Sequence, residues 1–215
     1  MSIWELPAST KVNKSIPKNA FDINASSRNK KQFIEYVDKI LWRNKIADFT
    51  VNLPYSEYQE FQIFEITLRK KAEITELLNL MDKTILYPVV FLLIYGEEMQ
   101  ISVAIKHLHP AKPNTTVIDW RFSSEWFTTE QNPYILQLTK SIDHTLTNLC
   151  TQLSSTKNEE KNLKTLIERE QTISKLQNEI AALTAEIKRT KQFKKKVELN
   201  LKLQKLSTEY QIISG

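Results

Sequence analysis

The sequence predicts an α+β protein, in which a mainly antiparallel sheet with packed helices is followed by a long C-terminal helical or coiled-coil extension. Residues 61–68 alternate apolar and polar side chains, and residues 88–95 form an uninterrupted apolar run; both patterns are typical of strands. Residues 30–42 and 73–83 repeat apolar side chains at helical spacing. Residues 155–215 lack proline and any glycine before the last residue, and their Leu, Lys, Glu and Gln content indicates helix.

These observations divide the chain into three parts. Residues 1–29 are polar and hold few periodic apolar positions, which predicts a basic N-terminal arm laid across the domain, with Ile16 and Phe21 as its apolar anchors. Residues 30–154 predict the α+β domain, and their apolar side chains suffice for a core of their own. Residues 155–215 predict one long helix or a helical hairpin.

Further elements complete the α+β domain. The run at 49–53 is consistent with a short strand. The strand at 88–95 and the apolar segment at 99–107 are separated by a short turn, which predicts an antiparallel hairpin. Residues 116–123 alternate like a strand with one buried face, and residues 133–153 carry a helical apolar stripe.

The C-terminal extension contains two apolar seams that are out of phase with each other. The spacing of 3 and 4 residues in each seam is typical of a coiled coil. Either one long helix changes its partner, or the chain folds back near residues 188–195; the absence of glycine and proline favours the long helix. Because an isolated amphipathic helix cannot bury its stripe, we expect a protein partner or self-association here. The predicted partner-binding residues are Ile173, Leu176, Ile180, Leu183, Ile187, Leu199, Leu203 and Leu206.

Composition excludes several classes of function. Only 2 glycines are present, so neither a phosphate-binding P-loop nor a dinucleotide fingerprint can form, and no cofactor is expected. The single cysteine, Cys150, excludes an intramolecular disulfide and a Cys-rich zinc site. The N-terminus lacks the pattern of a signal peptide, and the longest apolar run is too short to cross a bilayer. We therefore expect a cytoplasmic protein that does not insert in a membrane.

Positive charge is concentrated at two places. The net charge is +5, and residues 155–215 hold 13 of the 30 basic and 8 of the 25 acidic residues, which accounts for all of it. The run KRTKQFKKK at 188–196 holds six cations, no acid and one aromatic, Phe193, and it predicts contact with a nucleic-acid backbone, although a solvated helix surface has the same pattern. A second basic stretch lies in the N-terminal arm. The predicted nucleic-acid-binding residues are Lys188, Arg189, Lys191, Lys194, Lys195, Lys196, Lys11, Lys14 and Lys18.

Catalytic patterns are weak. His107 and His109 are two residues apart and share a face if they lie on a strand, but a metal site needs a third ligand, for which His144 or Asp119 is available. Glu65 is not followed by the acid-x-Lys pattern of a restriction-type nuclease core. Cys150 has no aligned histidine and reads as a buried residue. We therefore predict no catalytic residues and no metal site, and favour a protein that is not an enzyme.

Several stretches together resemble a known family. They are LPASTKVNKSIPKNAF at 6–21, ILW with its following lysine at 40–45, FQIFEITL at 61–68, YPVVFLLIY at 87–95 and QFKKKVELN at 192–200. The chain resembles an uncharacterised bacterial family, classed as a domain of unknown function, whose members are encoded beside methyltransferase and helicase genes of restriction–modification-like phage-defence clusters. The resemblance implies a genomic context and a type of partner, and it carries no catalytic residues to this chain.

Three hypotheses follow. In the first, the protein is a non-catalytic accessory subunit of a DNA-processing, anti-phage complex: it docks on a helicase or methyltransferase and touches the backbone of duplex DNA. In the second, it is a metal-dependent nuclease with a degenerate site at Glu65, Asp119 or the pair His107 and His109. In the third, it is a structural homodimer held by a coiled coil. The basic run and the helical seams, together with what the resemblance implies about partners, favour the first hypothesis.

Overall fold

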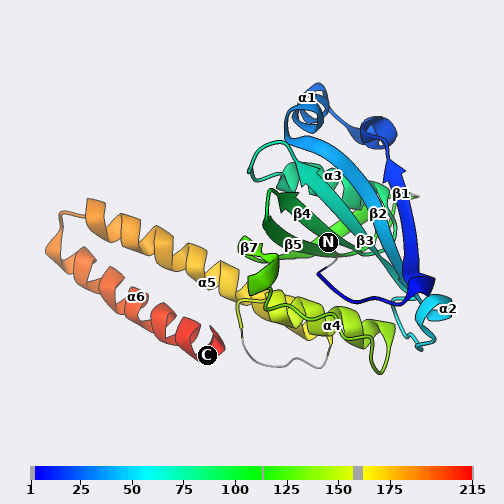
Figure 1. The fold of residues 1–215 in the computed structure, drawn as a ribbon. Coiled ribbons are helices and arrows are strands. Elements are labelled where there is room, and N and C mark those ends of the chain that lie inside the picture. The colour runs from blue at the N-terminus through cyan, green and yellow to red at the C-terminus, as the bar shows by residue number, and fades with distance from the viewer. Residues whose placement is uncertain (1–2, 113, 157–161, 215) are drawn as a thin grey trace. The chain divides into compact units, whose positions relative to one another are not determined.

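The computed structural model describes residues 3–112, 114–156 and 162–214 of the chain. It contains two compact units, Met1–Leu153 and Ser154–Gly215. The first unit holds a mixed sheet with helices, and the second is a pair of long helices (Figure 1). The predicted α+β class with a C-terminal helical extension is therefore confirmed.

The sheet of the first unit is mostly antiparallel. Its strands follow the order β1-β2-β3-β4-β5-β6, and a short β7 pairs with β5. Only β3 and β4 run parallel, because the chain crosses between them through helix α3 (Thr75–Thr84), as parallel neighbours require. The strands are β1 (Lys11–Ile16), β2 (Val37–Ala47), β3 (Glu60–Leu68), β4 (Val89–Tyr95), β5 (Glu98–Leu108), β6 (Thr116–Ser123) and β7 (Phe127–Thr128).

Short helices connect and cover these strands. Helices α1, α3 and η2 contact one another on one face of the sheet, and α4 contacts β6. The central strand β4 reads VVFLLIY, and Val90 and Leu92 are as buried as Phe91 and Leu93, so both of its faces are covered. The remaining elements of this unit are η1 (Ala8–Thr10), η2 (Lys18–Asn24), α1 (Ser27–Tyr36), α2 (Asp48–Val51), η3 (Thr129–Gln131) and α4 (Ile142–Leu153).

The helix predicted at 30–42 is wrong in its second half. Helix α1 begins after Ser26, whose side chain accepts a hydrogen bond from the backbone of Asn29, and it ends at Tyr36. Val37 leaves the helix in an extended conformation, and the chain continues as β2, the longest partner of β3. The apolar residues of 37–42 fit either a helical or an extended pattern, and pairing with β3 decided between them.

Two other predictions need correction. The segment at 49–53 is not a strand: it contains the single turn α2, after which Asn52 takes a left-handed conformation with φ of 54°. The helix predicted at 133–153 begins only at Ile142. Lys140 has a φ of 59°, and the backbone N–H of Ile142 donates to the carbonyl of Pro54, so the preceding segment is held by contacts distant in sequence.

The N-terminal arm is part of the fold. Residues 11–16 form β1, the edge strand beside β2. Phe21 is buried in the core and stacks on Phe33, with ring centroids 6.0 Å apart, and Ile16 packs against the same cluster. The indole Nε1 of Trp4 donates to the carbonyl of Tyr134 at 3.0 Å. Both predicted anchors of the arm, Ile16 and Phe21, therefore contact the core.

The second unit is a helical hairpin. Helices α5 (Leu163–Arg189) and α6 (Phe193–Ser214) run antiparallel (Figure 1), and the guanidinium of Arg169 donates to the carbonyl of Ile213 near the open end. The preference for one long helix was wrong. The chain turns without glycine or proline because Thr190 leaves α5 in an extended conformation that any residue adopts. Within the described part of the chain, no helix combines the length and the apolar composition that crossing a membrane requires.

One carboxylate ties the β2–β3 connection to α4, and it makes stability depend on pH. Asp143 accepts hydrogen bonds from the backbone N–H groups of Ser56, Glu57 and Tyr58 at 2.7–3.0 Å. Burial by itself would raise the pKa of Asp143, but these three donors outweigh burial and lower it. The stabilisation is therefore complete above about pH 4 and is lost as the pH falls through the lowered pKa.

We expect Asp143→Asn to lower the free energy of unfolding by about 1 kcal/mol at neutral pH, since solvent screens this half-buried group. Urea unfolding followed by circular dichroism at several pH values measures the difference, which should shrink as the pH falls below about 4. The exposed Glu130→Gln serves as the control. A difference between wild type and Asp143→Asn that stays constant with pH would contradict the assignment.

Candidate functional sites

The basic run of the sequence forms the tip of the helical hairpin. Lys188 and Arg189 lie in the last turn of α5, where cations interact favourably with the helix dipole. Lys191 lies in the turn, and residues 194–196 begin α6. The structure thus brings all six predicted cations of this run to one end of the hairpin, on both sides of one turn.

The tip carries an excess of positive charge. Lys195 forms an exposed ion pair with Glu186 at 3.0 Å, and the first turn of α6 contains no acid. The positive end of the α6 dipole adds to the lysines there, so they repel one another unless an anion is present. Phe193 stands among them with 82% of its surface exposed. Clustered exposed cations beside an exposed aromatic ring are features that suit a phosphate backbone and a sugar or base.

The predicted N-terminal lysines lie on the edge strand β1 and in η2. Lys11 pairs with Asn44 and Lys14 with Trp42 of β2, and a register shift lies between the two pairs. The ammonium group of Lys18 donates a hydrogen bond to the carbonyl of Val37, so this lysine has a structural role. Lys11 and Lys14 are exposed, and their contact with nucleic acid stays a prediction.

The predicted partner-binding residues lie along the hairpin. On α5, Ile173, Leu176 and Leu183 are buried, and Ile180 and Ile187 are half-buried. On α6, Leu199, Leu203 and Leu206 are half-buried, and the neighbouring Tyr210 accepts a hydrogen bond from Gln177 of α5. The out-of-phase seams of the sequence therefore belong to two helices that run in opposite directions.

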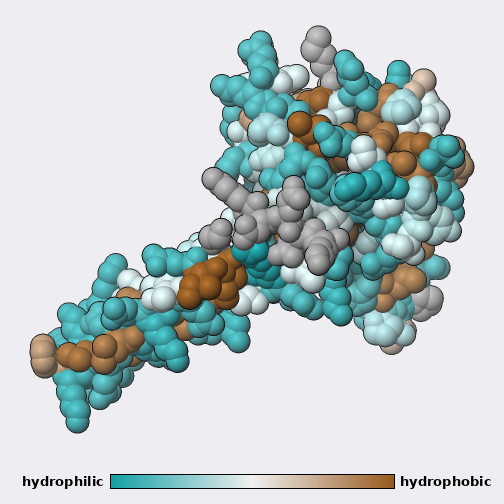
Figure 2. All heavy atoms as spheres, turned by 90° about the horizontal axis from the view of Figure 1, so that it is seen from below, coloured by the Kyte–Doolittle hydropathy of each residue, from teal (hydrophilic) through white to brown (hydrophobic). Residues whose placement is uncertain are grey.

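A second apolar stripe on α6 is exposed. Phe193, Val197 and Leu201 recur every four residues, and Val197 and Leu201 are 43% and 63% exposed. At 3.6 residues per turn, this stripe lies opposite the seam of Leu199 and Leu203. Figure 2 shows hydrophobic surface along this unit among hydrophilic side chains. Because α6 is apolar on two opposite sides, contact with α5 leaves one side uncovered.

The residues of the nuclease hypothesis are engaged in pairs. The carboxylate of Glu65 lies 3.2 Å from Arg43 Nε, and His107 Nδ1 lies 2.8 Å from Asp119 Oδ1. His109 Nδ1 accepts from the backbone N–H groups of Ala111 and Lys112, so it shapes the loop after β5. In the part of the chain that the structure describes, no three His, Cys, Asp or Glu side chains are grouped so as to hold a metal ion.

The other two candidate side chains from the sequence, Cys150 and His144, both lie in helix α4. Cys150 is fully buried in α4, and burial raises the pKa of its thiol. The backbone N–H of His144 donates to Ser141 Oγ at the start of the same helix.

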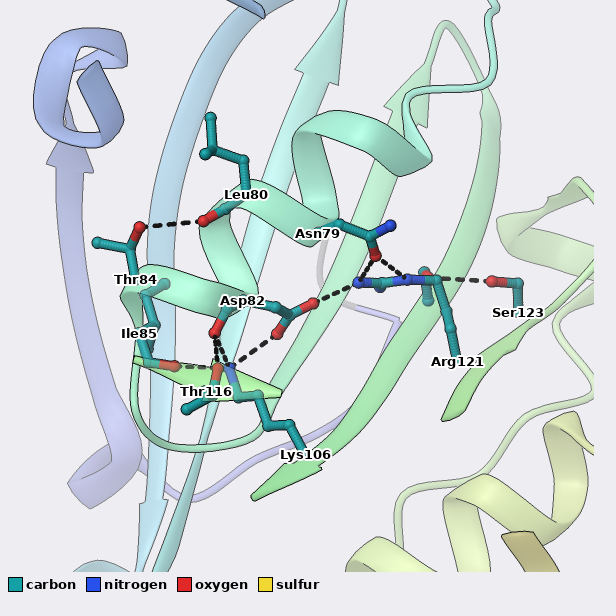
Figure 3. Close-up of polar contacts among 10 residues, drawn as sticks. Asn79, Leu80, Asp82, Thr84, Ile85, Lys106, Thr116, Arg121 and Ser123 are labelled. Atoms are coloured by element: carbon teal, nitrogen blue, oxygen red, sulfur yellow. Dashed lines mark hydrogen bonds and ion pairs between the residues drawn. The ribbon is translucent and has the colours of Figure 1, made fainter. Parts of the chain in front are cut away.

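The most charged part of the interior is a network that sequence reasoning missed. Asp82 at the end of α3 and Lys106 on β5 form an ion pair at 2.9 Å, and both side chains are completely buried (Figure 3). Lys106 also donates to the backbone carbonyls of Asp82 at 2.8 Å and Ile85 at 2.6 Å, so its three N–H groups have three acceptors. Burial lowers the pKa of Lys106 and outweighs the opposing effect of Asp82.

Strand β6 joins the same network at both of its ends. The guanidinium of Arg121 contacts the second carboxylate oxygen of Asp82 and donates to Asn79 Oδ1 at 2.9 Å and to Ser102 Oγ at 3.0 Å. The hydroxyl of Thr116 donates to the backbone carbonyl of Asp82 at 2.7 Å. The sequence contained one signal of this network, which was the lysine in the apolar strand ISVAIK. A buried ammonium group requires an acidic partner, so this lysine predicts a buried carboxylate near it.

Comparison with known proteins gives a family and nothing narrower. Residues 5–209 match the model of a family described as "Domain of unknown function (DUF4391)". No curated protein matches the chain, and no solved structure matches it.

The buried network makes a prediction about stability. We expect Asp82→Asn to cost about 3–5 kcal/mol of unfolding free energy, because it leaves both Lys106 and Arg121 without their carboxylate. Lys106→Met should cost less, since Asp82 keeps Arg121, and the double variant should cost less than the sum of the two. Urea unfolding at neutral pH measures all three. Glu98→Gln, which removes an exposed ion pair with Lys71, is the control and should cost under about 1 kcal/mol. Additive effects of the two buried substitutions would contradict the coupling.

Proposed function

The chain belongs to the DUF4391 family of domains of unknown function, and from that premise we propose that it is a non-catalytic accessory subunit of a multi-protein DNA-processing complex. In this proposal the protein works in the cytoplasm in restriction–modification-like defence against phage. It docks on a helicase or methyltransferase and touches the backbone of duplex DNA. The kind of partner comes from the resemblance of the sequence to a family encoded beside such enzymes.

One observation carries the DNA part of the proposal. Six cations gather at the tip of the hairpin, and Glu186 is the acid paired with one of them. These side chains are not part of a hydrophobic core, because residues 191–196 are all exposed. Exposed lysines and arginines are suited to phosphates in any sequence, because they contact the charge of the backbone and not the base edges. The proposal is therefore for binding without sequence preference.

A second observation supports the docking part. The stripe formed by Phe193, Val197 and Leu201 is apolar and exposed, and it lies along the N-terminal part of α6. Exposed apolar helix faces bind the apolar face of another helix or a groove on a partner. Because the seam of α6 that faces α5 is already half-covered, the uncovered stripe is the better surface for assembly.

The DNA contact is tested by salt dependence. We expect the wild-type protein to bind duplex DNA with an affinity that falls linearly with salt on logarithmic axes. Lys194→Glu/Lys196→Glu should weaken binding and reduce that slope by about 2, roughly one for each lost phosphate contact. Fluorescence anisotropy at several salt concentrations measures both quantities. Lys164→Glu/Lys175→Glu, which changes the same charge on exposed positions of α5, is the matched control. An equal loss of DNA affinity in the two variants, or an affinity that does not change with salt concentration, would refute a contact at the tip.

The assembly surface is tested by co-expression with a helicase and a methyltransferase of the kind that the resemblance implies. We expect wild-type protein to co-purify with one of them and Val197→Glu/Leu201→Glu to lose that partner, because two buried charges would disrupt an apolar contact. Asn178→Glu/Ala182→Glu, on exposed positions of α5, should keep it. Mass measurement in solution decides the alternative: a wild-type dimer that becomes monomeric in the stripe variant would identify a homodimer instead.

A further inference from the structure

A groove separates helix α3 from strand β6 in the first unit. Its volume is about 710 Å³, within the range of pockets that bind ligands. One wall is formed by Thr75, Asn79 and Lys83, which recur every four residues and so lie on one face of α3. The other wall is the continuous run 115–121, and His109 and Lys112 of the loop before β6 close one end.

The groove follows the edge of the sheet. In the described sheet β6 is the last strand of the order and pairs with β5 alone. The residues from 115 to 121 line the cavity without a gap, so the cavity follows the strand. The register of β6 shifts at Asp119, because Trp120 pairs with Ile105 and Ile118 with Lys106. Ile118 therefore shares the face of Thr116 and Arg121, which contact α3, and Trp120 lies on the opposite face. A strand edge of this kind offers a row of backbone donors and acceptors to another extended chain.

The width of the groove is fixed before any ligand arrives. Near one end of β6, Thr116 is bonded to the backbone carbonyl of Asp82, and near the other end Arg121 is bonded to Asn79 and to the Asp82 carboxylate. Both tethers reach the same helix, α3, and both belong to the network around Lys106 (Figure 3). A preformed site loses less conformational entropy on binding than one that must close around its ligand.

The charge of the groove selects its ligand. Lys83 and Lys112 line it and are exposed, and no ion pair of either is recorded among the described residues. Four of the five N–H groups of Arg121 donate to Asn79, Ser102 and Asp82, and its side chain is only 11% exposed. The one carboxylate of the lining, Asp119, is paired with His107. The cations available to a ligand are therefore the two lysines, and they favour an acidic one.

We propose that this groove binds an extended acidic segment of a partner protein, which adds to β6 as a further strand. Main-chain hydrogen bonds to β6 hold the segment, Lys83 and Lys112 pair with its carboxylates, and Ile118 contacts an apolar side chain on the face toward α3. A second copy fits poorly, because it presents the same lysines. A single-stranded nucleic acid has the charge but lacks the amide groups that a strand edge requires. The inference extends the proposed docking role, and it does not depend on DNA binding at the hairpin tip.

The experiment uses the full chain and a short synthetic peptide of alternating valine and glutamate. We expect binding that slows hydrogen exchange of the β6 backbone amides, and no binding of the same peptide with lysine in place of glutamate. Two further peptides carry N-methyl groups on the odd or on the even residues; one of them should lose binding and the other keep it, because only one row of N–H groups faces β6. Equal binding of the two N-methylated peptides would overturn strand addition.

Variants of the chain test the charge. Lys83→Glu/Lys112→Glu should weaken the acidic peptide about tenfold, whereas Lys31→Glu/Lys39→Glu, an equal charge change at exposed positions of α1 and β2, should leave it unchanged. The Lys194→Glu/Lys196→Glu tip variant should bind the peptide normally even if it fails to bind DNA. Unchanged affinity in the groove variant would overturn the proposal. Two other results would also overturn it. One is that oligothymidylate slows hydrogen exchange of the β6 amides and displaces the peptide. The other is a dimer of this chain in which the β6 amides exchange slowly without peptide.

Discussion

The arrangement of the first unit depends on one buried carboxylate, that of Asp82. It lies between Lys106 and Arg121, and its backbone carbonyl accepts from Lys106 and Thr116. Moving these charges out of water costs several kcal/mol for each ion, and complete pairing offsets that cost. These contacts hold α3, β5 and β6 together, and loss of the carboxylate leaves two cations without their partner. Apolar packing is not directional, so it allows a helix to shift over a sheet. Hydrogen bonds between specific atoms are directional, and they fix the position of the helix on the sheet.

The same contacts shape a surface. Because both ends of β6 are tied to α3, the space between them stays open as a groove along a strand edge. Edge strands usually carry protection against unwanted pairing, and β6 has a register irregularity opposite Ile105 and Lys106. The lysines at the rim add a second filter, since they repel basic chains and copies of this chain. An edge that accepts only an acidic strand is a selective surface rather than a site of aggregation.

The second unit presents different surfaces on the two sides of α6 and at the turn between its helices. One side of α6 faces α5, the opposite side presents Phe193, Val197 and Leu201 to solvent, and the turn gathers the cations. A helix that is apolar on two opposite sides has little overall amphipathicity, so periodicity alone underestimates its importance. Charge at the tip and apolar surface along the side are compatible with simultaneous contact to a phosphate backbone and to a protein.

The sequence by itself determined the α+β class, the strands β3 to β6, helix α3 and the helical nature of the C-terminal segment. These follow from local periodicity, which survives in any tertiary context. It also located the cations of the tip, because they are contiguous in the chain. Only the tertiary structure decided that residues 37–47 pair with β3, that Thr190 turns the helix back, and that Asp82, Lys106 and Arg121 meet. The physical reason is distance along the chain: strand pairing and buried charge pairs join residues tens of positions apart, and no local pattern records which partners they find.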